Sequence, residues 1–322
     1  MQMRCYMKKY ISLLFILIYG CFLLSGCCSQ TAKADNLKSY EVIDTKGNSV
    51  KMKGKPMRIV SLTLGTDEII MDLVPAERIV GLTCLSDDPG ISHISERSKQ
   101  IKGKINGNNV EAILALNPDL VIIADWWDSK VMTTLRDMGI PVYVYKTPYS
   151  LDEVRTSIKE VAELVGEEEK GQKVIRKFDE KLEAVKKKAE KIPVSEEKNI
   201  IALVPHGGFG AKGSMFNDMC KFAHVRNRIG DLEPQLAQTL SKEQIVAMNP
   251  DAFVIPTWDG GGMMKAATKE ELLQDKALAT TNAIKNKDIV EVPGRCVYTI
   301  SQYVADGVEI LAAGIYPKYF KD

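Results

Sequence analysis

The sequence predicts an α/β protein with two related lobes, each built on a parallel sheet, joined by one long helix. Three observations support this fold class: an internal repeat, short apolar strands that alternate with amphipathic helices, and a long charged helical segment midway between the two repeat copies. The chain has 322 residues, of which 45% are hydrophobic. That length and composition are enough for two lobes with cores of their own.

The internal repeat pairs residues 110–123, VEAILALNPDLVII, with residues 242–255, KEQIVAMNPDAFVI. The identical pairs are Glu111 with Glu243, Ile113 with Ile245, Ala115 with Ala247, the two Asn-Pro-Asp triplets and, beyond the copies, Trp126 with Trp258. Each pair is separated by 132 residues. Such a period is too long for a solenoid and fits two copies of one α/β lobe.

Each copy predicts an amphipathic helix that a proline stops after Asn117 or Asn249, followed by a short buried strand. Ser241 with Gln244 three residues later is a start signal for the second of these helices. Further short apolar strands are predicted at residues 58–62, 78–82, 141–145, 200–204 and 289–292. Helices and strands therefore alternate along both halves of the chain.

The segment between the lobes has a different composition. Residues 167–191 carry Val174, Phe178, Leu182 and Val185 on one helical face and a dense mixture of Lys and Glu elsewhere, and a proline follows. At about 1.5 Å per residue this helix would be roughly 37 Å long, enough to join two lobes rigidly. An ordinary surface helix is the alternative, but the position between the repeat copies favours the connecting role.

The N-terminus predicts export from the cytoplasm. Three basic residues precede an apolar run at residues 11–24, and small residues stand before Cys27. This pattern resembles a bacterial lipoprotein signal, which implies acylation of Cys27, rather than Cys28, after removal of residues 1–26. An uncleaved transmembrane anchor is the alternative, but the run is shorter than a spanning helix requires. We therefore expect an extracytoplasmic protein anchored to the cell membrane.

Charge and cysteine content restrict the partners further. Removal of residues 1–26 leaves a net charge of about −2, which implies no nucleic-acid or anionic-membrane partner. Cys84, Cys220 and Cys296 are far apart in the sequence and form no CxxC motif. They are neither a disulfide framework nor a zinc motif, and buried free thiols are favoured, although one disulfide stays possible.

Residues 58–83, RIVSLTLGTDEIIMDLVPAERIVGLT, resemble the opening of the substrate-binding lipoproteins of ABC importers for ferric siderophores, haem and cobalamin. The resemblance continues through both Asn-Pro-Asp strands and ends in the segment ISQYVADGVEILAAGIYP. It implies two Rossmann-like lobes with central parallel sheets, joined by one long α-helix, with the ligand in the cleft between them. The implied divisions are a tether and leading hairpin at 27–56, an N-terminal lobe at 57–165, the connecting helix at 166–192 and a C-terminal lobe at 193–322.

The same resemblance implies how the protein meets its partners, an ABC permease and its ATPase. In this family an acidic residue on each lobe surface pairs with arginines of the permease. Glu68 and Asp218 are the corresponding residues here, and a plain first-turn glutamate stabilised by the helix dipole is the alternative for Glu68. We expect the protein to be a monomer.

Ligands of open parallel sheets bind beyond the carboxyl ends of the strands, so loops after the strands should hold the ligand. The candidates in those loops are Trp126, Trp127, His206, Phe209, Trp258, Arg295, Tyr298 and Tyr303. Aromatic faces with few fixed charges suit a bulky metal chelate: a ferric siderophore first, then cobalamin or haem. His206 could be an axial ligand to the metal or a hydrogen-bonding loop residue. No permanently bound cofactor is expected.

Two other functions stay open. Gly208, Gly210 and Gly213 satisfy GxGxxG after a strand, with Asp231 further on, so an extracytoplasmic dinucleotide-binding oxidoreductase is a formal alternative. The other is a surface receptor that acts without its own permease. The sequence has no nucleophile elbow, P-loop or HExxH motif, and we expect a protein that is not an enzyme.

Overall fold

The computed structural model describes residues 39–204, 207–258, 260 and 268–320. One compact unit begins at Lys38 and contains both large sheets and all three hydrophobic core clusters found in the described part of the chain. The predicted signal peptide and the predicted acylation site, Cys27, lie outside the described residues. Within the described residues, no helix combines the length and the apolarity needed to cross a membrane.

The first large sheet is parallel and has the strand order β5-β4-β3-β6-β7. Its strands are β3 (Ile59–Ser61), β4 (Ile79–Thr83), β5 (Gly103–Ile105), β6 (Leu120–Ala124) and β7 (Val142–Tyr145). The helices that connect and follow them are α2 (Leu64–Leu73), α3 (Ser95–Ser98), α4 (Val110–Ala115), α5 (Ser129–Asp137) and α6 (Leu151–Val165), with short 3-10 turns at Ala76–Arg78 and Cys84–Asp87. An antiparallel hairpin of β1 (Tyr40–Ile43) and β2 (Ser49–Met52) precedes this sheet, as predicted.

The second large sheet repeats this arrangement in the order β10-β8-β11-β12, with β9 added antiparallel to β8. Its strands are β8 (Asn199–Val204), β9 (Gly207–Phe209), β10 (Arg226–Asn227), β11 (Ala252–Pro256) and β12 (Ile289–Val292). Its helices are α8 (Met215–Phe222), α9 (Pro234–Gln238), α10 (Lys242–Met248), α11 (Lys269–Gln274), α12 (Asn282–Lys285), α13 (Gly294–Val297), α14 (Val304–Ile315) and α15 (Pro317–Phe320), and a 3-10 turn at Val194–Glu196 precedes β8.

The internal repeat is confirmed as a structural repeat. In both sheets the repeated segment forms a helix, α4 or α10, and then an inner strand, β6 or β11. Asn117 and Asn249 end these helices with φ of 45° and 43°. The left-handed conformation lets asparagine close a helix before the proline prevents its continuation.

The aspartates of the two Asn-Pro-Asp triplets have the same task in both sheets. Asp119 accepts hydrogen bonds from the backbone N–H groups of Met57 (2.7 Å) and Arg58 (2.8 Å) where β3 begins. Asp251 accepts one from Asn199 N (3.0 Å) where β8 begins. Burial would raise the pKa of Asp251, but the hydrogen bonds it accepts outweigh burial and lower it. Each triplet therefore fixes the start of the neighbouring strand.

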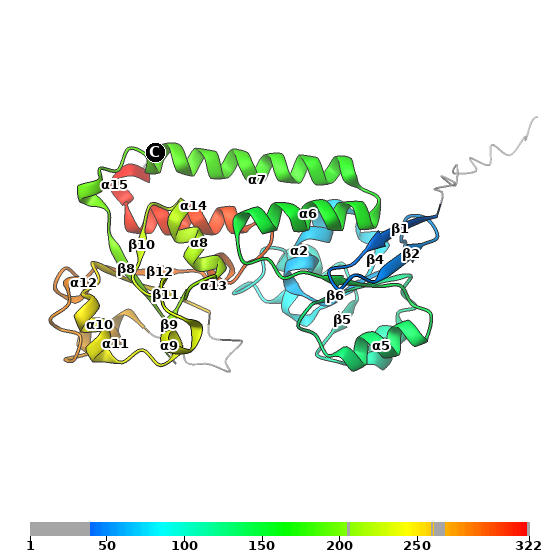
Figure 1. The fold of residues 1–322 in the computed structure, drawn as a ribbon, viewed down its shortest axis with the longest axis horizontal. Coiled ribbons are helices and arrows are strands. Elements are labelled where there is room, and N and C mark those ends of the chain that lie inside the picture. Colours follow the sequence, from blue (N-terminus) through cyan, green and yellow to red (C-terminus); the bar gives the residue numbers. More distant parts are fainter. Residues whose placement is uncertain (1–38, 205–206, 259, 261–267, 321–322) are drawn as a thin grey trace, which may run out of the picture. The chain divides into compact units, whose positions relative to one another are not determined.

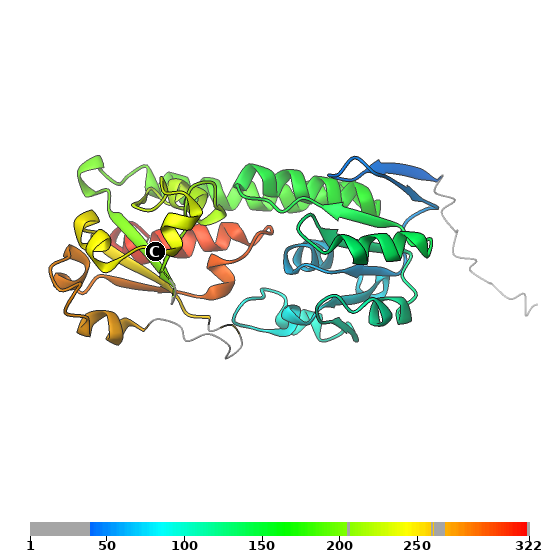
Figure 2. The same ribbon diagram turned by 60° about the horizontal axis from the view of Figure 1, so that its bottom comes forward.

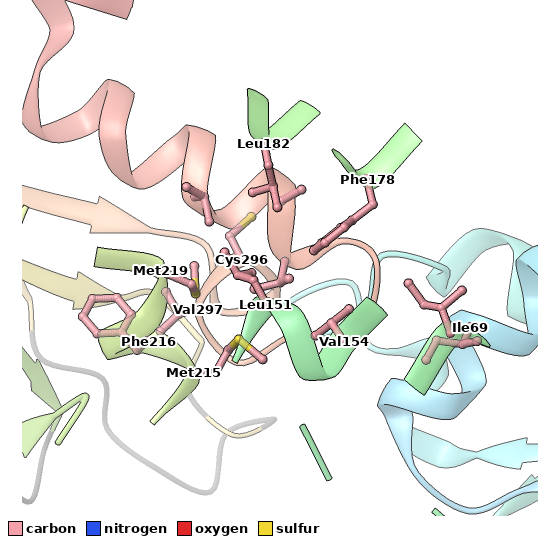
Figure 3. Close-up of a cluster of buried hydrophobic side chains, with 14 of the residues drawn as sticks. Ile69, Leu151, Val154, Phe178, Leu182, Met215, Phe216, Met219, Cys296 and Val297 are labelled. Atoms are coloured by element: carbon pink, nitrogen blue, oxygen red, sulfur yellow. The ribbon is translucent and has the colours of Figure 1, made fainter. Parts of the chain in front are cut away.

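A long helix, α7 (Glu168–Ala189), follows α6 and runs beside α6 and α14 (Figure 1). It corresponds to the helix predicted at residues 167–191. Phe178, Leu182 and Val185 are buried on the predicted apolar face, where they join side chains of α2, α6, α8 and α14 in one core cluster (Figure 3). The view in Figure 2 shows the two large sheets at different positions along α7. One continuous core beside α7 thus joins both sheets.

Candidate functional site

A cavity of about 600 Å³ opens at the carboxyl ends of the first sheet, and we call it the N-side cavity. Residues within two positions after the end of each of the five strands contribute to its wall, from Leu62 after β3 to Thr147 after β7. Residues 298–300, which follow the second sheet, close its opposite side. The parallel sheet thus gathers five loops around one space, as open α/β sheets do at their ligand sites.

Aromatic side chains dominate one wall of the N-side cavity. The rings of Trp126 and Trp127 lie 5.4 Å apart between centroids, tilted by 33°. Trp126 is 65% exposed, an unusual state for so large an apolar side chain. The buried Nε1 of Trp127 has no hydrogen-bond partner in the described residues. This wall therefore offers the open ring face of Trp126.

A second cavity, of about 500 Å³, lies at the second sheet, and we call it the C-side cavity. Phe209, at the end of β9, lines it together with the glycine-rich loop at residues 210–213. The two cavities share Thr147 and residues 298–300. Tyr298 packs edge-on against Phe209, with 5.2 Å between ring centroids. The shared residues make the cavities two halves of one cleft.

The described walls of the cleft carry little positive charge. No described residue of the N-side cavity wall is Lys, Arg or His, while Glu68 and Asp128 are acidic. In the described wall of the C-side cavity the only basic residue is Lys212, which forms an ion pair with Glu233 at 3.0 Å. A ligand with several negative charges would find no unpaired cation among these side chains.

The docking role predicted for Glu68 is wrong, because only 1% of this residue is exposed. Its Oε1 accepts a hydrogen bond from His93 N (2.9 Å), and its Oε2 accepts from Thr299 Oγ1 (3.1 Å) and from Ser301 Oγ. We call Glu68, His93, Thr299 and Ser301 the junction network. A buried carboxylate is stable only with such partners. Glu68 therefore ties α2 to the segment after the second sheet.

Asp67, the neighbour of Glu68, is a second buried carboxyl group in α2. Its Oδ2 accepts hydrogen bonds from Thr83 N (3.0 Å) and Thr83 Oγ1 (2.6 Å), whereas its Oδ1 has no partner in the described residues. Burial raises the pKa of Asp67 to about 7, because these hydrogen bonds only partly offset the lost hydration. Asp67 thus titrates near neutral pH.

Trp258 and Arg295, both predicted to bind the ligand, bridge the two sides of the cleft and line neither cavity. Trp258 Nε1 donates to Asp88 Oδ2 at 2.8 Å, and Arg295 Nη1 donates to Pro89 O at 3.1 Å. The indole packs so closely on Gly90 that a Cβ atom there would lie 2.6 Å from Trp258 Cδ1. These contacts hold the loop after β4 against the end of the second sheet.

Three further predicted residues have other surroundings. Tyr303 does not line the cleft, which corrects the prediction, because its ring stacks on His93 at 4.7 Å and its hydroxyl donates to Asp72 at 3.0 Å. Asp218 accepts a hydrogen bond from Leu151 N at 3.0 Å, so it caps α6. His206 lies outside the described residues. The ligand and docking roles of the other candidates stay predictions.

The glycine-rich loop lacks the geometry of a dinucleotide site. In such sites the loop runs directly from a parallel strand into a helix. Here Gly208 belongs to β9, which turns back antiparallel on β8, and α8 begins only at Met215. A Cβ atom on Gly208 would lie 2.8 Å from Ile229 Cδ1, so this glycine serves packing. The dinucleotide motif is a coincidence of spacing.

Sequence reasoning missed several residues of the cleft wall. Cys84 follows β4, and Asn106 and Asn108 follow β5. Cys84 is an exposed free thiol, while Cys220 and Cys296 are buried free thiols, so these three cysteines form no disulfide. The position of Cys84 after a predicted strand was a usable signal. β5 has only three residues, so the sequence gave no signal that Asn106 and Asn108 follow a strand.

Comparisons with known proteins agree with this architecture. A family model described as "Periplasmic binding protein" matches residues 59–296. An uncharacterised ABC transporter substrate-binding lipoprotein of Bacillus subtilis (strain 168), YvrC, is 29% identical and covers 98% of this chain and 100% of its own length. A vitamin B12-binding protein of Vibrio parahaemolyticus is 26% identical over 64% of this chain and 73% of its own length.

Among solved structures, the periplasmic haem-binding protein RhuT of Roseiflexus sp. RS-1 superposes with a TM-score of 0.67. The two are 23% identical, and the match covers 81% of this chain and 98% of that protein. At that identity the likeness concerns the fold.

Proposed function

Because the chain belongs to the periplasmic binding protein family, we propose that it is the extracytoplasmic solute-binding component of an ABC importer, anchored as a lipoprotein. Its cargo would be a bulky metal chelate, held in the cleft and delivered to a membrane permease and its ATPase. The observation that carries this proposal is the pair of cavities, 600 and 500 Å³, that meet at residues 298–300. Together they suit a ligand larger than an amino acid or a simple sugar.

The charge of the cleft supports a narrower cargo class. Haem carries two carboxylates and a ferric catecholate carries several negative charges, and both would leave anionic groups without a partner against the described walls. A corrinoid or a neutral ferric hydroxamate would bury uncharged surface against Trp126 and Trp127. We therefore place uncharged chelates, cobalamin among them, ahead of anionic siderophores and haem.

The test is a titration of the protein with cyanocobalamin, ferrichrome, haemin and ferric enterobactin, followed by tryptophan fluorescence. Saturable quenching at submicromolar concentration by cyanocobalamin or ferrichrome alone is the expected result. Tighter binding of haemin or ferric enterobactin would contradict the cargo class but keep the importer role. Binding of none of the four would contradict the chelate cargo.

Docking to the permease needs exposed residues, and the repeat supplies a pair. Glu111 and Glu243 are identical repeat positions, and both are exposed in the first turn of their helices, α4 and α10. Hydrogen bonds from its own backbone N–H and from Ser241 lower the pKa of Glu243, so it is ionised at neutral pH. We propose this pair, in place of Glu68, as the carboxylates that meet the permease.

Charge reversal of Glu111 and Glu243 distinguishes docking to the permease from binding of the ligand. The double variant Glu111→Lys/Glu243→Lys should keep the ligand affinity within twofold and should lower ligand uptake by cells at least tenfold. The matched control is Glu183→Lys/Glu190→Lys, which reverses two exposed carboxylates on and after α7. Unchanged uptake by the first variant would favour a surface receptor that acts without its own permease.

A further inference from the structure

A third cavity, of about 640 Å³, lies beside α7 and shares no lining residue with the cleft, and we call it the hinge groove. One wall is α7, from Lys170 to Lys181, and the other walls come from the end of α2 and the start of α14. Glu68 faces the N-side cavity, and Asp72, one turn later on α2, faces the hinge groove. The two spaces are therefore separate, and α2 contributes to the walls of both at positions one helical turn apart.

The hinge groove has an excess of positive charge. Its lining contains five basic residues, Arg97, Lys170, Lys173, Lys177 and Lys181, but only two acidic ones, Asp72 and Asp306. Three of the basic residues have carboxylate partners: Arg97 pairs with Asp72 (2.7 Å), Lys170 with Glu167 (3.1 Å), and Lys181 with Asp306 and Glu309. Within the described part of the chain, Lys173 and Lys177 form no ion pair.

The spacing of Lys173 and Lys177 concentrates the excess positive charge in one part of the groove. Lys173 and Lys177 are four residues apart on α7, so their stems rise from one helical face with about 6 Å of axial separation. Like charges at this spacing repel each other, and Lys170 and Lys181 extend the same row on either side. An anion bound between Lys173 and Lys177 would remove this repulsion.

The opposite wall contains a buried acceptor without a partner. Gln302 is only 8% exposed, and its Nε2 donates to Glu68 O and to Asp72 Oδ2, each at 2.8 Å. Gln302 belongs to the groove lining, and its Oε1, which is shielded from solvent, has no hydrogen-bond partner in the described residues. Since buried polar atoms are normally satisfied, this oxygen points to a missing donor. A ligand that fits the groove would bring a hydroxyl group as well as negative charge.

We propose that the hinge groove binds a hydroxyl-bearing phosphate ester, that is, a polyol phosphate. The phosphate, with a charge of about −1.5 to −2 near neutral pH as a monoester, would lie between Lys173 and Lys177. A hydroxyl group would donate to Gln302 Oε1, and the carbon chain would lie on Val174 and Met71. The ester could be a soluble metabolite or the head group of an anionic lipid, since both present the same chemistry.

Calorimetric titration of the chain from Lys38 onward with glycerol 3-phosphate tests the soluble form of this ligand. The folded unit begins at Lys38 and contains both sheets, so this chain retains the groove. We expect saturable binding that weakens at least tenfold in Lys173→Gln/Lys177→Gln. The control Lys186→Gln/Lys187→Gln makes the same charge change on α7 outside the groove and should stay within twofold of the parent.

Two further arms complete the test. Sulfate has the charge but no hydroxyl donor, so it should bind at least fivefold more weakly than glycerol 3-phosphate, and equal binding would overturn the role of Gln302. Sedimentation with phosphatidylglycerol vesicles, compared with phosphatidylcholine vesicles, tests the lipid source. If the protein binds the anionic vesicles alone and Lys173→Gln/Lys177→Gln abolishes this binding, the ligand is a lipid head group. No binding in either arm, or equal binding by both double variants, would overturn the site.

Discussion

Replacement of Trp126 by alanine is the most direct test of the aromatic cleft. A tryptophan side chain presents up to about 250 Å² of surface, and Trp126 is 65% exposed, so about 160 Å² is open to solvent without ligand. A flat chelate would cover one ring face, roughly half of that area. At about 25 cal/mol per Å², burial of ~80 Å² contributes about 2 kcal/mol, which corresponds to a roughly 30-fold change in Kd.

The assay is a calorimetric titration of Trp126→Ala and of the parent with the ligand that the fluorescence titration identifies. Calorimetry is used because the substitution removes a fluorophore. Folding stability should change by less than about 0.5 kcal/mol, since an exposed ring contributes little to it. Met138→Ala is the control, because Met138 is 59% exposed and follows α5 but lines neither cavity. A Kd for Trp126→Ala within twofold of the parent would refute the aromatic cleft.

Three predictions concern the groups buried around the cleft. Because the pKa of Asp67 is about 7 when folded and 3.8 in its ordinary state, its ionisation lowers the free energy of unfolding as pH rises from about 4 to about 7. Asp67→Asn should remove this dependence on pH. In urea unfolding, the free energy of unfolding of the variant should exceed that of the parent by an amount that grows from about pH 4 to about pH 7 and then stays constant. A difference that is the same at all pH values would contradict the raised pKa of Asp67. Glu68→Ala should cost about 1–3 kcal/mol of unfolding free energy, because it leaves two buried hydroxyl groups without their acceptor, whereas a change below 0.5 kcal/mol would mean that the carboxylate is exposed after all. Trp258→Phe keeps an aromatic ring but removes the indole N–H that donates to Asp88, so it should cost at least about 1 kcal/mol, and an equal loss in the double variant Asp88→Asn/Trp258→Phe would confirm that the two side chains act together.

Several parts of the fold follow from local sequence rules alone. The hairpin turn at Gly47, with φ of 80°, and the capping box of Ser241 with Gln244 depend on residues within a few positions of each other. The repeat predicted two equivalent helix-to-strand units, and α7 agrees with its apolar spacing to within two residues at each end. Such features need no information about distant residues, so a single sequence is enough to predict them.

The candidate site was predicted less completely. Trp126, Trp127, Phe209 and Tyr298 do line the cleft, because the carboxyl ends of parallel strands always share one edge of the sheet. Tyr303 was assigned to the same edge, but it lines the hinge groove and its ring stacks on His93. The three-residue strand β5 and the two-residue strand β10 were missed, because so short a segment carries no periodic pattern.

By itself, the sequence determined the class of the protein: two related α/β lobes, a connecting helix, and aromatic loops at the strand ends. Only the tertiary structure decided which individual side chains face the ligand, which bridge the lobes, and which are buried. Glu68 shows the reason, because its position in α2 is the same whether its partners are water and a permease or Thr299 and Ser301, more than 230 residues away. Burial and pairing are properties of contacts between distant segments, and these contacts exist only once both sheets have packed against α7.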